Sequence, residues 1–367
     1  MQNRLNKASS SRAGAPVAPR CTRGSLLAVR AISASAVDSL QGVRAEVLDA
    51  ISKATQNCLN DTNLSIGERK KGKVRDTYDL GDKVVIVTTD RQSAFDRHLA
   101  SIPFKGQVLN QTSAWWFKNT THIVKNASIS MPDPNVTIMK KCTVFPVEFV
   151  VRGFMTGSTD TSLWTHYNAG EREYCGNDFP DGMKKNDRLS SNVMTPTTKA
   201  EDHDVPISPT EIVAQGLMTQ EEWNTVSAAA LALFAFGQAE SAKRGLLLVD
   251  TKYEFGKDKD GVIHLIDEIH TPDSSRYWIA DTFEARHAAG KEPENIDKEF
   301  LRLWFRERCD PYKDEVLPEA PHELVCELSK RYVYLYEKIT GEAFQVPDLN
   351  TPINARMDKA VRAALGL

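Results

Sequence analysis

The chain has 367 residues, of which 41% are hydrophobic and 26% are charged, the ordinary composition of a soluble globular protein large enough for two domains. The formal net charge of -3 gives no general attraction to nucleic acid or to an anionic membrane, and no apolar run is long enough to span a bilayer, so we expect neither as a partner. The cysteines are too scattered for the close pairs of zinc or redox motifs, which predicts free thiols in a reducing compartment at Cys21, Cys58, Cys142, Cys175, Cys309 and Cys326.

The N-terminal residues differ from the rest of the chain, because no acidic residue precedes Asp38 while arginine, alanine and serine are frequent. This is the composition of an organelle transit peptide, and the apolar centre of a secretory signal is missing. Gly14 and two nearby prolines interrupt any amphipathic helix, which favours the chloroplast over the alternative, a mitochondrion. We therefore assign residues 1–36 to a removed transit peptide, against the alternative of a plain basic tail, and expect a short helix over residues 37–54.

Residues 37–150 are predicted to form a β-rich lobe that binds a nucleotide. Residues 83–88 (KVVIVT) are a β-branched run, and Leu80-Gly81-Asp82 before them is typical of a hairpin turn. Another strand is expected over residues 144–152, interrupted by a proline, and the two tryptophans within residues 113–117 favour a helix.

Residues 151–290 are predicted to form a second lobe of mixed helix and strand. Two capping boxes, Ser208-Pro-Thr-Glu211 and Thr219-Gln-Glu-Glu222, mark helix starts. The helix after the second box is expected to end at Lys243-Arg244-Gly245, where basic residues precede a glycine. A hairpin over residues 246–269 follows, with its turn in a glycine-bounded polar stretch.

Residues 291–367 are predicted to form a C-terminal helical cover and tail. A helix over residues 322–339 carries one apolar stripe, and we expect it to be the last ordered element. The chain is therefore assigned to the α+β class, with a β-rich N-terminal lobe, a mixed second lobe and a helical cover.

A glycine-bearing basic turn is the first chemical signal. The stretch from Gly67 to Val74 almost spells a P-loop, but Val74 stands where a hydroxyl must hold magnesium, and a strand follows where a helix should. In that strand Lys73 and Arg75 share one face next to Gly72, which suits a lid over a polyphosphate. The alternative is a solvated basic turn.

Two polar segments follow buried strands. Asp90 and Ser93 come after the strand over residues 83–88 and are candidates for ligand contacts, although a capped turn has the same pattern.

Arg152 ends a second strand and runs into a turn that ends at Ser158. A guanidinium, glycine backbone and a hydroxyl together suit an anion site, against the alternative of a surface ion pair.

The hairpin carries the most informative pattern. Alternation places Asp250, Lys252 and Glu254 on one face, and Asp267 on the returning strand can meet them across the hairpin. Three gathered carboxylates are costly unless they bind a cation, and oxygen ligands suit Mg²⁺ carried by a nucleotide. The alternative is a solvated hairpin face, which the apolar residues before Asp250 make less favourable.

A short polar loop with Asp273, Ser275 and Arg276 is a second candidate for phosphate binding. Neither of its serines is expected to be a nucleophile, because the sequence places no histidine to activate it.

In combination these segments resemble the phosphoribosylaminoimidazole-succinocarboxamide synthase (SAICAR synthetase) family over residues 64–344, and the N-terminal extension fits a plastid form. The motifs that carry the resemblance are Gly72-Lys-Val-Arg75-Asp-Thr-Tyr78, Asp90-Arg-Gln-Ser-Ala-Phe-Asp96, Phe145-Pro-Val-Glu148 through Arg152 to Thr156-Gly-Ser158, Pro196-Thr-Thr-Lys199 with His203-Asp204, Asp250-Thr-Lys-Tyr-Glu-Phe-Gly256, and Asp267-Glu with Thr271-Pro-Asp-Ser-Ser-Arg276.

The resemblance implies a two-lobed, kinase-like or ATP-grasp-like arrangement and an ATP-dependent carbon–nitrogen ligase of purine synthesis. Its substrates are ATP, L-aspartate and carboxyaminoimidazole ribonucleotide, its metal is Mg²⁺, its route passes through an acyl phosphate, and a homo-oligomer stays open. The implied roles are ATP binding by Gly72, Lys73, Arg75 and Lys199, metal binding by Glu254 and Asp267, catalysis by Lys252 and Asp250, and substrate binding by Asp90, Ser93, Arg152, Ser158, Asp273, Ser275 and Arg276. A small-molecule kinase and a non-catalytic nucleotide-binding regulator are the rival functions.

Overall fold

The structure is a computed structural model that describes residues 42–95, 97–199, 205–296 and 298–367. The predicted transit peptide, Asp96 and the His203-Asp204 pair lie outside these residues. Five of the six cysteines are described, and their thiols are free, as expected: Cys58, Cys142, Cys175, Cys309 and Cys326.

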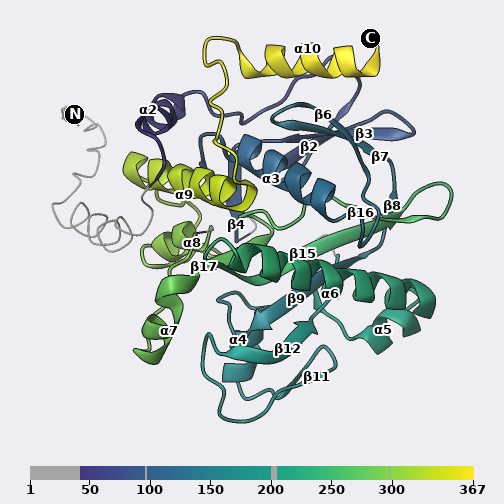
Figure 1. The fold of residues 1–367 in the computed structure, drawn as a ribbon, viewed down its shortest axis with the longest axis vertical. Helices are drawn as coiled ribbons and strands as arrows, with labels where there is room; N and C mark the ends of the chain where they lie inside the picture. Colours follow the sequence, from purple (N-terminus) through teal and green to yellow (C-terminus); the bar gives the residue numbers. More distant parts are fainter. Residues whose placement is uncertain (1–41, 96, 200–204, 297) are drawn as a thin grey trace, which may run out of the picture. The chain divides into compact units, whose positions relative to one another are not determined.

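The N-terminal lobe is built on a five-stranded antiparallel sheet in the order β1-β2-β3-β7-β6 (Figure 1). Its strands are β1 (Arg69–Lys71), β2 (Arg75–Asp79), β3 (Lys83–Thr88), β6 (Ser128–Asp133) and β7 (Val136–Lys140). The predicted hairpin joins β2 to β3, with Gly81 at φ 90°, and β2 runs as a strand where a P-loop would need a helix. Helix α3 (Lys105–Asn119) packs against β3 and contains the predicted segment 113–117.

The second lobe is an eight-stranded sheet around the long central strand β15. Its strands are β8 (Thr143–Val144), β9 (Val147–Phe154), β12 (Arg188–Met194), β13 (Thr197–Thr198), β14 (Val205–Pro206), β15 (Leu246–Lys257), β16 (Ile263–Ile266) and β17 (Ser275–Ile279). The break between β8 and β9 is the predicted interruption at the proline. Two small hairpins complete the strands: β4 (Arg91–Ala94) with β5 (Arg97–Ser101), and β10 (Glu173–Tyr174) with β11 (Asn177–Asp178).

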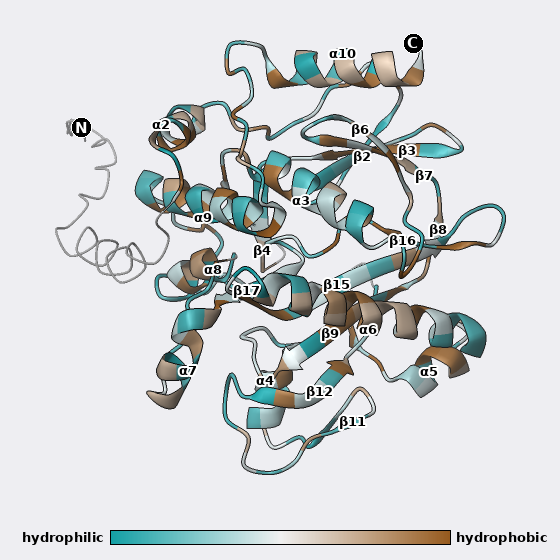
Figure 2. Ribbon diagram, viewed as in Figure 1, coloured by the Kyte–Doolittle hydropathy of each residue, from teal (hydrophilic) through white to brown (hydrophobic). Residues whose placement is uncertain are grey.

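Both predicted capping boxes are present. Ser208 and Glu211 start α5 (Pro209–Ala214), and Thr219 and Glu222 start α6 (Gln220–Ala242), with reciprocal side-chain to backbone hydrogen bonds in each. Helix α6 lies along β15, β9 and β12. Figure 2 shows much of α6 in the brown of hydrophobic residues, as expected for a helix that covers a sheet.

The remaining helices of the described residues are α2 (Ala45–Ala54), α4 (Leu163–Asn168), α7 (Ala280–Ala288), α8 (Glu299–Arg306), α9 (His322–Thr340) and α10 (Ile353–Leu365). Helix α9 confirms the predicted C-terminal helix and packs against α3 and α2. Within the described residues, no helix is long and apolar enough to cross a membrane.

Two predicted boundaries are wrong. Helix α9 is not the last ordered element, because α10 follows it and packs against β6 (Figure 1). Met357 and Val361 of α10 are completely buried in the core of the first sheet. The strand after the hairpin turn does not reach residue 269. It stops at Ile266, because Asp267 has a left-handed backbone with φ 65°, which a strand cannot contain.

Candidate active site

The face of β15 that carries alternate charged residues forms the centre of the site. Lys252 Nζ lies 2.7 Å from Glu148 Oε1 on the neighbouring strand β9 and 2.6 Å from Glu254 Oε1 on its own strand. Burial by itself lowers the pKa of Lys252, but the charges of Glu254 and Glu148 outweigh it, so the pKa lies above its ordinary value. Lys252 is therefore a fixed positive charge in this state.

Glu254 is held by two lysines. Its second carboxylate oxygen accepts a hydrogen bond from Lys199, which follows β13, while the first accepts from Lys252. The side chain of Glu254 is only 9% exposed, and burial raises its pKa, but the two lysines outweigh burial and lower the pKa to about 2. Two residues assigned to different roles, Lys199 and Glu254, are thus in direct contact.

The first sheet reaches this face through Arg75. Its Nη1 lies 2.6 Å from Asp267 Oδ1 and its Nη2 lies 2.5 Å from Glu268 Oε1. Burial, together with the charges of Glu254 and Glu268, raises the pKa of Asp267 to about 6 despite the opposing charge of Arg75. Asp267 therefore lies within electrostatic range of Glu254 on β15, and a left-handed turn rather than a continuing strand brings it there.

The fit to a divalent cation rests on this excess of negative charge. Asp267 and Glu268 both pair with the guanidinium of Arg75, and the charge of Glu254 also raises the pKa of Asp267. A hard cation with oxygen ligands would relieve the repulsion that Asp267 experiences from these two carboxylates. Among the described residues, no three acidic, histidine or cysteine side chains form a complete metal cage. Carboxylate oxygens are the donors that Mg²⁺ prefers, so the side chains of Glu254 and Asp267 are of the type that suits this ion.

A second cluster continues along β15 toward Asp250. Arg276 donates a hydrogen bond to Asp250 Oδ2, and Arg152 Nη1 lies 3.5 Å from the same oxygen. Arg152 is 7% exposed, and its Nε donates to Thr195 Oγ1 at 2.7 Å while its Nη2 donates to the Thr161 carbonyl at 3.2 Å. Arg152 is thus a buried, oriented guanidinium.

Ser158 belongs to the same cluster through a partner that the sequence did not indicate. Its hydroxyl donates a 2.6 Å hydrogen bond to Glu299 Oε1 in α8, and Arg302 Nη1 lies 3.4 Å from Glu299 Oε2. Burial raises the pKa of Glu299, but Arg276 and Arg302 outweigh it and hold the pKa below its ordinary value. An apolar pattern with Phe300, Leu301, Trp304 and Phe305 was the available signal for α8.

Asp273 is held by a buried lysine that the sequence analysis also missed. Lys105 Nζ, with 0% side-chain exposure, lies 2.8 Å from Asp273 Oδ2, and Lys298 Nζ lies 3.9 Å from Oδ1. Tyr332 donates to Asp273 Oδ1 at 3.1 Å. Burial raises the pKa of Asp273, but the two lysines outweigh it and lower the pKa. Asp273 thus anchors α3 and α9 beside the site.

Three of the remaining predicted residues have structural partners. Asp90 accepts the backbone N–H groups of Leu59 at 2.7 Å and Gly106 at 2.9 Å, and burial raises its pKa to about 6. Ser275 Oγ lies 2.7 Å from Thr251 Oγ1 beneath the site. Gly72 allows a tight turn, because a Cβ there would lie 2.5 Å from the Arg75 carbonyl.

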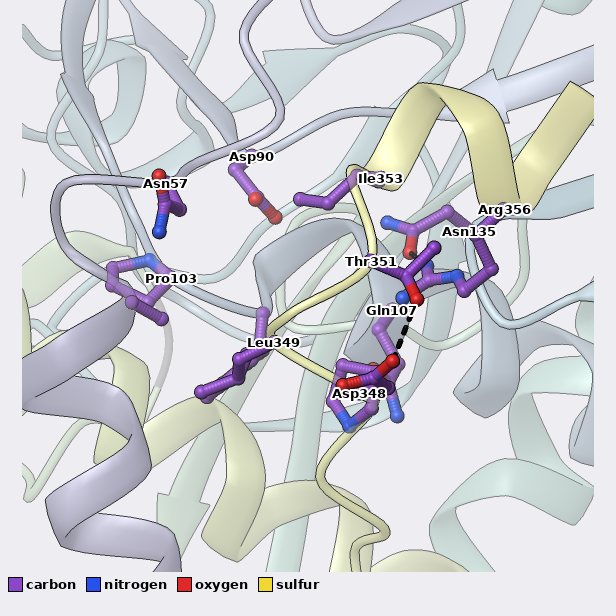
Figure 3. Close-up of a pocket in the computed structure, with 13 residues that line it drawn as sticks. Asn57, Asp90, Pro103, Gln107, Asn135, Asp348, Leu349, Thr351, Ile353 and Arg356 are labelled. Atoms are coloured by element: carbon purple, nitrogen blue, oxygen red, sulfur yellow. Dashed lines mark hydrogen bonds between the residues drawn. The ribbon is translucent and has the colours of Figure 1, made fainter.

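Asp90 does not join the residues on β15. It lines a separate small cavity of about 30 Å³ with residues of α3 and of the segment before α10 (Figure 3). Ser93 lies in the β4–β5 hairpin, opposite His98, and Lys73 is exposed at the turn before β2. The structure therefore brings together the predicted residues on β9, β15 and β17 and those around Arg75, and leaves Asp90 apart.

Comparison with known proteins agrees with this arrangement. The sequence model described as SAICAR synthetase matches residues 68–319. A chloroplastic phosphoribosylaminoimidazole-succinocarboxamide synthase from Arabidopsis thaliana is 62% identical over 88% of this chain and 80% of its own length. A Saccharomyces cerevisiae SAICAR synthase structure with SAICAR superimposes with a TM-score of 0.66 and 28% identity, covering 78% of this chain and 100% of that one.

A second solved structure, a SAICAR synthetase in complex with ADP, has a TM-score of 0.58 and 26% identity, covering 76% of this chain and 100% of that one. These matches define the class of the protein as an ATP-dependent carbon–nitrogen ligase with an α+β fold. Within that class, the chain belongs to the SAICAR synthetase family. The resemblance inferred from the motifs is thereby confirmed.

Proposed function

We propose that this chain joins L-aspartate to the carboxylate of carboxyaminoimidazole ribonucleotide, with ATP as the energy source, as a step of purine synthesis. The carboxylate takes the γ-phosphoryl group of ATP to give an acyl phosphate, and the aspartate amine then displaces phosphate to form the amide. The observation that carries the proposal is the placement of Lys252 between Glu148 and Glu254 on the eight-stranded sheet.

The ATP phosphates bind under the turn at Gly72, with Lys73, Arg75 and Lys199 as cationic ligands. In the structure without ligands, Lys199 and Arg75 neutralise Glu254 and Asp267. The same two carboxylates would hold the metal, and Lys199 and Arg75 would then pair with the phosphates instead. When bound, Mg²⁺ supplies the positive charge that neutralises the transferred phosphoryl group.

The ribonucleotide binds along β15 on the side of Asp250. Arg152, Ser158 and Arg276 bind its phosphate, and Asp273 and Ser275 fix the loop before Arg276. A role of Asp90 and Ser93 in substrate binding stays a prediction, because Asp90 lies apart from this cluster and its carboxylate accepts two backbone N–H groups. Lys252 remains protonated because its pKa is raised, which suits stabilisation of the attacked carboxyl group and excludes it as the base in this state. Asp250 orients the two arginines beside the reacting carboxyl group.

The proposed site of action is the plastid stroma. The acid-free composition of residues 1–36 and the name of the chloroplastic relative support import into that compartment. Assembly into a homo-oligomer stays a prediction.

The test is to incubate the chain without residues 1–36 with ATP, Mg²⁺, L-aspartate and carboxyaminoimidazole ribonucleotide. ADP and the amide product are expected to appear together in equal amounts. Lys252→Met should abolish both, whereas the exposed Lys243→Met should leave both unchanged. Release of ADP without aspartate, together with a stable phosphate ester, would instead identify a small-molecule kinase.

A further inference from the structure

Three groups from different elements converge on the carboxylate of Glu299, the first residue of α8. The Ser158 hydroxyl donates to Oε1 at 2.6 Å, and the guanidinium groups of Arg302 and Arg276 lie 3.4 and 3.9 Å from Oε2. Glu299 is 7% exposed, so water contributes little to its solvation. The anion-binding groups of this end of the site thus already hold an anion that belongs to the chain.

We propose that Glu299 occupies the place of the ribonucleotide phosphate in the unliganded enzyme and that the substrate phosphate displaces it. The inference rests on the proposed function, in which Ser158 and Arg276 bind that phosphate. A hydroxyl and two guanidinium groups suit a carboxylate and a phosphate equally, because both present several charged acceptor oxygens. A substrate phosphate beside Arg276 would be repelled by the Glu299 carboxylate, since like charges at close range repel strongly in a buried cluster.

The side of the cluster formed by Ser158 is rigid. Gly157 before it has φ +118°, and a Cβ there would lie 2.3 Å from the Ser162 side chain, so the loop is closely packed. Ser162 Oγ also accepts the Thr159 N–H at 2.9 Å. Arg306, at the end of α8, donates to the Ser158 carbonyl at 2.6 Å. The backbone that carries Ser158 is therefore held by its surroundings.

The backbone of α8 is also held, because its apolar face is buried: Phe300, Leu301, Trp304 and Phe305. Displacement therefore requires rotation of the Glu299 side chain rather than movement of the helix. An open cavity of about 1010 Å³ lies beside the cluster, lined by Thr159, Asp160 and Thr161 on the loop side and by Arg302 and Arg306 on the helix side. It gives the displaced carboxylate access to water and to Arg306.

Glu299 then acts as a positioning and specificity residue. It keeps Arg276 and Arg302 oriented in the empty site, and it lowers the affinity for every ligand that carries a phosphate at this position. A ligand that lacks the phosphate does not compete with the Glu299 carboxylate for these groups. Removing the negative charge of Glu299 should therefore strengthen binding of the ribonucleotide without strengthening binding of ligands that lack the phosphate.

The experiment is calorimetric titration of carboxyaminoimidazole ribonucleotide into the full chain and into Glu299→Gln, which keeps the shape of the side chain and an acceptor for Ser158. We expect the ribonucleotide to bind the variant about tenfold more tightly, as expected for loss of one competing charge-assisted contact. The corresponding nucleoside, without the phosphate, should bind both proteins equally, and inorganic phosphate should compete with the ribonucleotide more effectively in the variant.

Glu327→Gln is the matched control, because the side chain of Glu327 is 12% exposed and pairs with Arg331 at 3.0 Å rather than with Ser158, Arg276 or Arg302. It should not change ribonucleotide affinity. Glu299→Asp, whose shorter side chain withdraws from Ser158, should shift the affinity in the same direction if Glu299→Gln folds poorly. Equal or weaker binding of the ribonucleotide by both variants, with normal binding by the unchanged chain, overturns the displacement. Absence of ribonucleotide binding to the unchanged chain overturns the proposed function instead, and this inference with it.

Discussion

Arg75 and Asp267 form an ion pair of 2.6 Å although 192 residues separate them in the chain. The pair joins the five-stranded sheet to the end of β16 in the eight-stranded sheet. A proposed phosphate ligand, Arg75, is thus in direct contact with a proposed metal ligand, Asp267. The charges of Glu254 and Glu268 also act on Asp267 and raise its pKa. This relationship makes the metal assignment testable.

Glu254→Gln and Asp267→Asn should each abolish turnover while leaving the fold intact. Each change removes one negative charge from a crowded cluster, which weakens metal binding and relieves repulsion in the unliganded protein. Product formation across a Mg²⁺ titration and the thermal midpoint of each variant are the measurements. Asp260→Asn, in the exposed hairpin turn, is the control. Near-normal activity of either variant at low Mg²⁺ would show that the metal assignment is wrong.

Mg²⁺–ATP affinity should weaken as the pH falls below about 6, because Asp267, with its pKa raised from 3.8 to about 6, becomes protonated. The contribution of Asp267 to folding stability changes with pH in the opposite direction. A carboxyl group with a raised pKa in the folded state contributes stability below pH 3.8, and this contribution is lost as the pH rises through about 6. Titrations between about pH 3 and pH 7, roughly one pH unit beyond the values of 3.8 and about 6, measure both effects. Asp267→Asn should flatten this part of both profiles, and an unchanged profile in the variant would assign the transition to another group.

Arg152→Lys should weaken ribonucleotide binding much more than ATP binding. A lysine cannot reproduce the paired contacts of the guanidinium with Thr195 and Thr161 and still face the ligand. The expected loss is about 1.5–3 kcal/mol, or roughly ten- to a hundredfold in affinity. Separate titrations of the two ligands are the measurement, with the exposed Arg188→Lys as control. Equal weakening of both ligands would mean that Arg152 serves another substrate.

Met357→Ala should destabilise the protein by about 2–5 kcal/mol, the usual cost of removing a fully buried methionine side chain. Met357→Leu, which conserves volume, should cost less than about 1.5 kcal/mol. Urea unfolding of the two variants measures the difference. Equal stability of Met357→Ala and the unchanged chain would show that α10 does not contribute to the core of the first sheet.

Residues 1–36 should be dispensable for catalysis and required for import into the chloroplast. The reason is their acid-free composition, rich in arginine, serine and alanine. A fluorescent protein carrying this segment should accumulate in plastids. Cytosolic fluorescence would contradict the transit assignment, and mitochondrial fluorescence would support the alternative destination.

The sequence by itself determined the features that depend on neighbouring residues. Strand alternation placed Asp250, Lys252 and Glu254 on one face, because side chains of a strand alternate with a period of two. The capping boxes at Ser208 and Thr219 fixed two helix starts, because a cap is satisfied within three residues. The motifs shared with the SAICAR synthetase family then indicated the functional class.

Only the tertiary structure decided which distant groups share a partner. Glu299 reaches Ser158 across 141 residues, and Lys252 reaches Glu148 across 104. Asp90 has the residue type of a ligand contact, yet two backbone N–H groups from distant segments occupy its carboxylate. No local pattern encodes such pairings, because they form only when packing of the apolar faces brings separate strands and helices together.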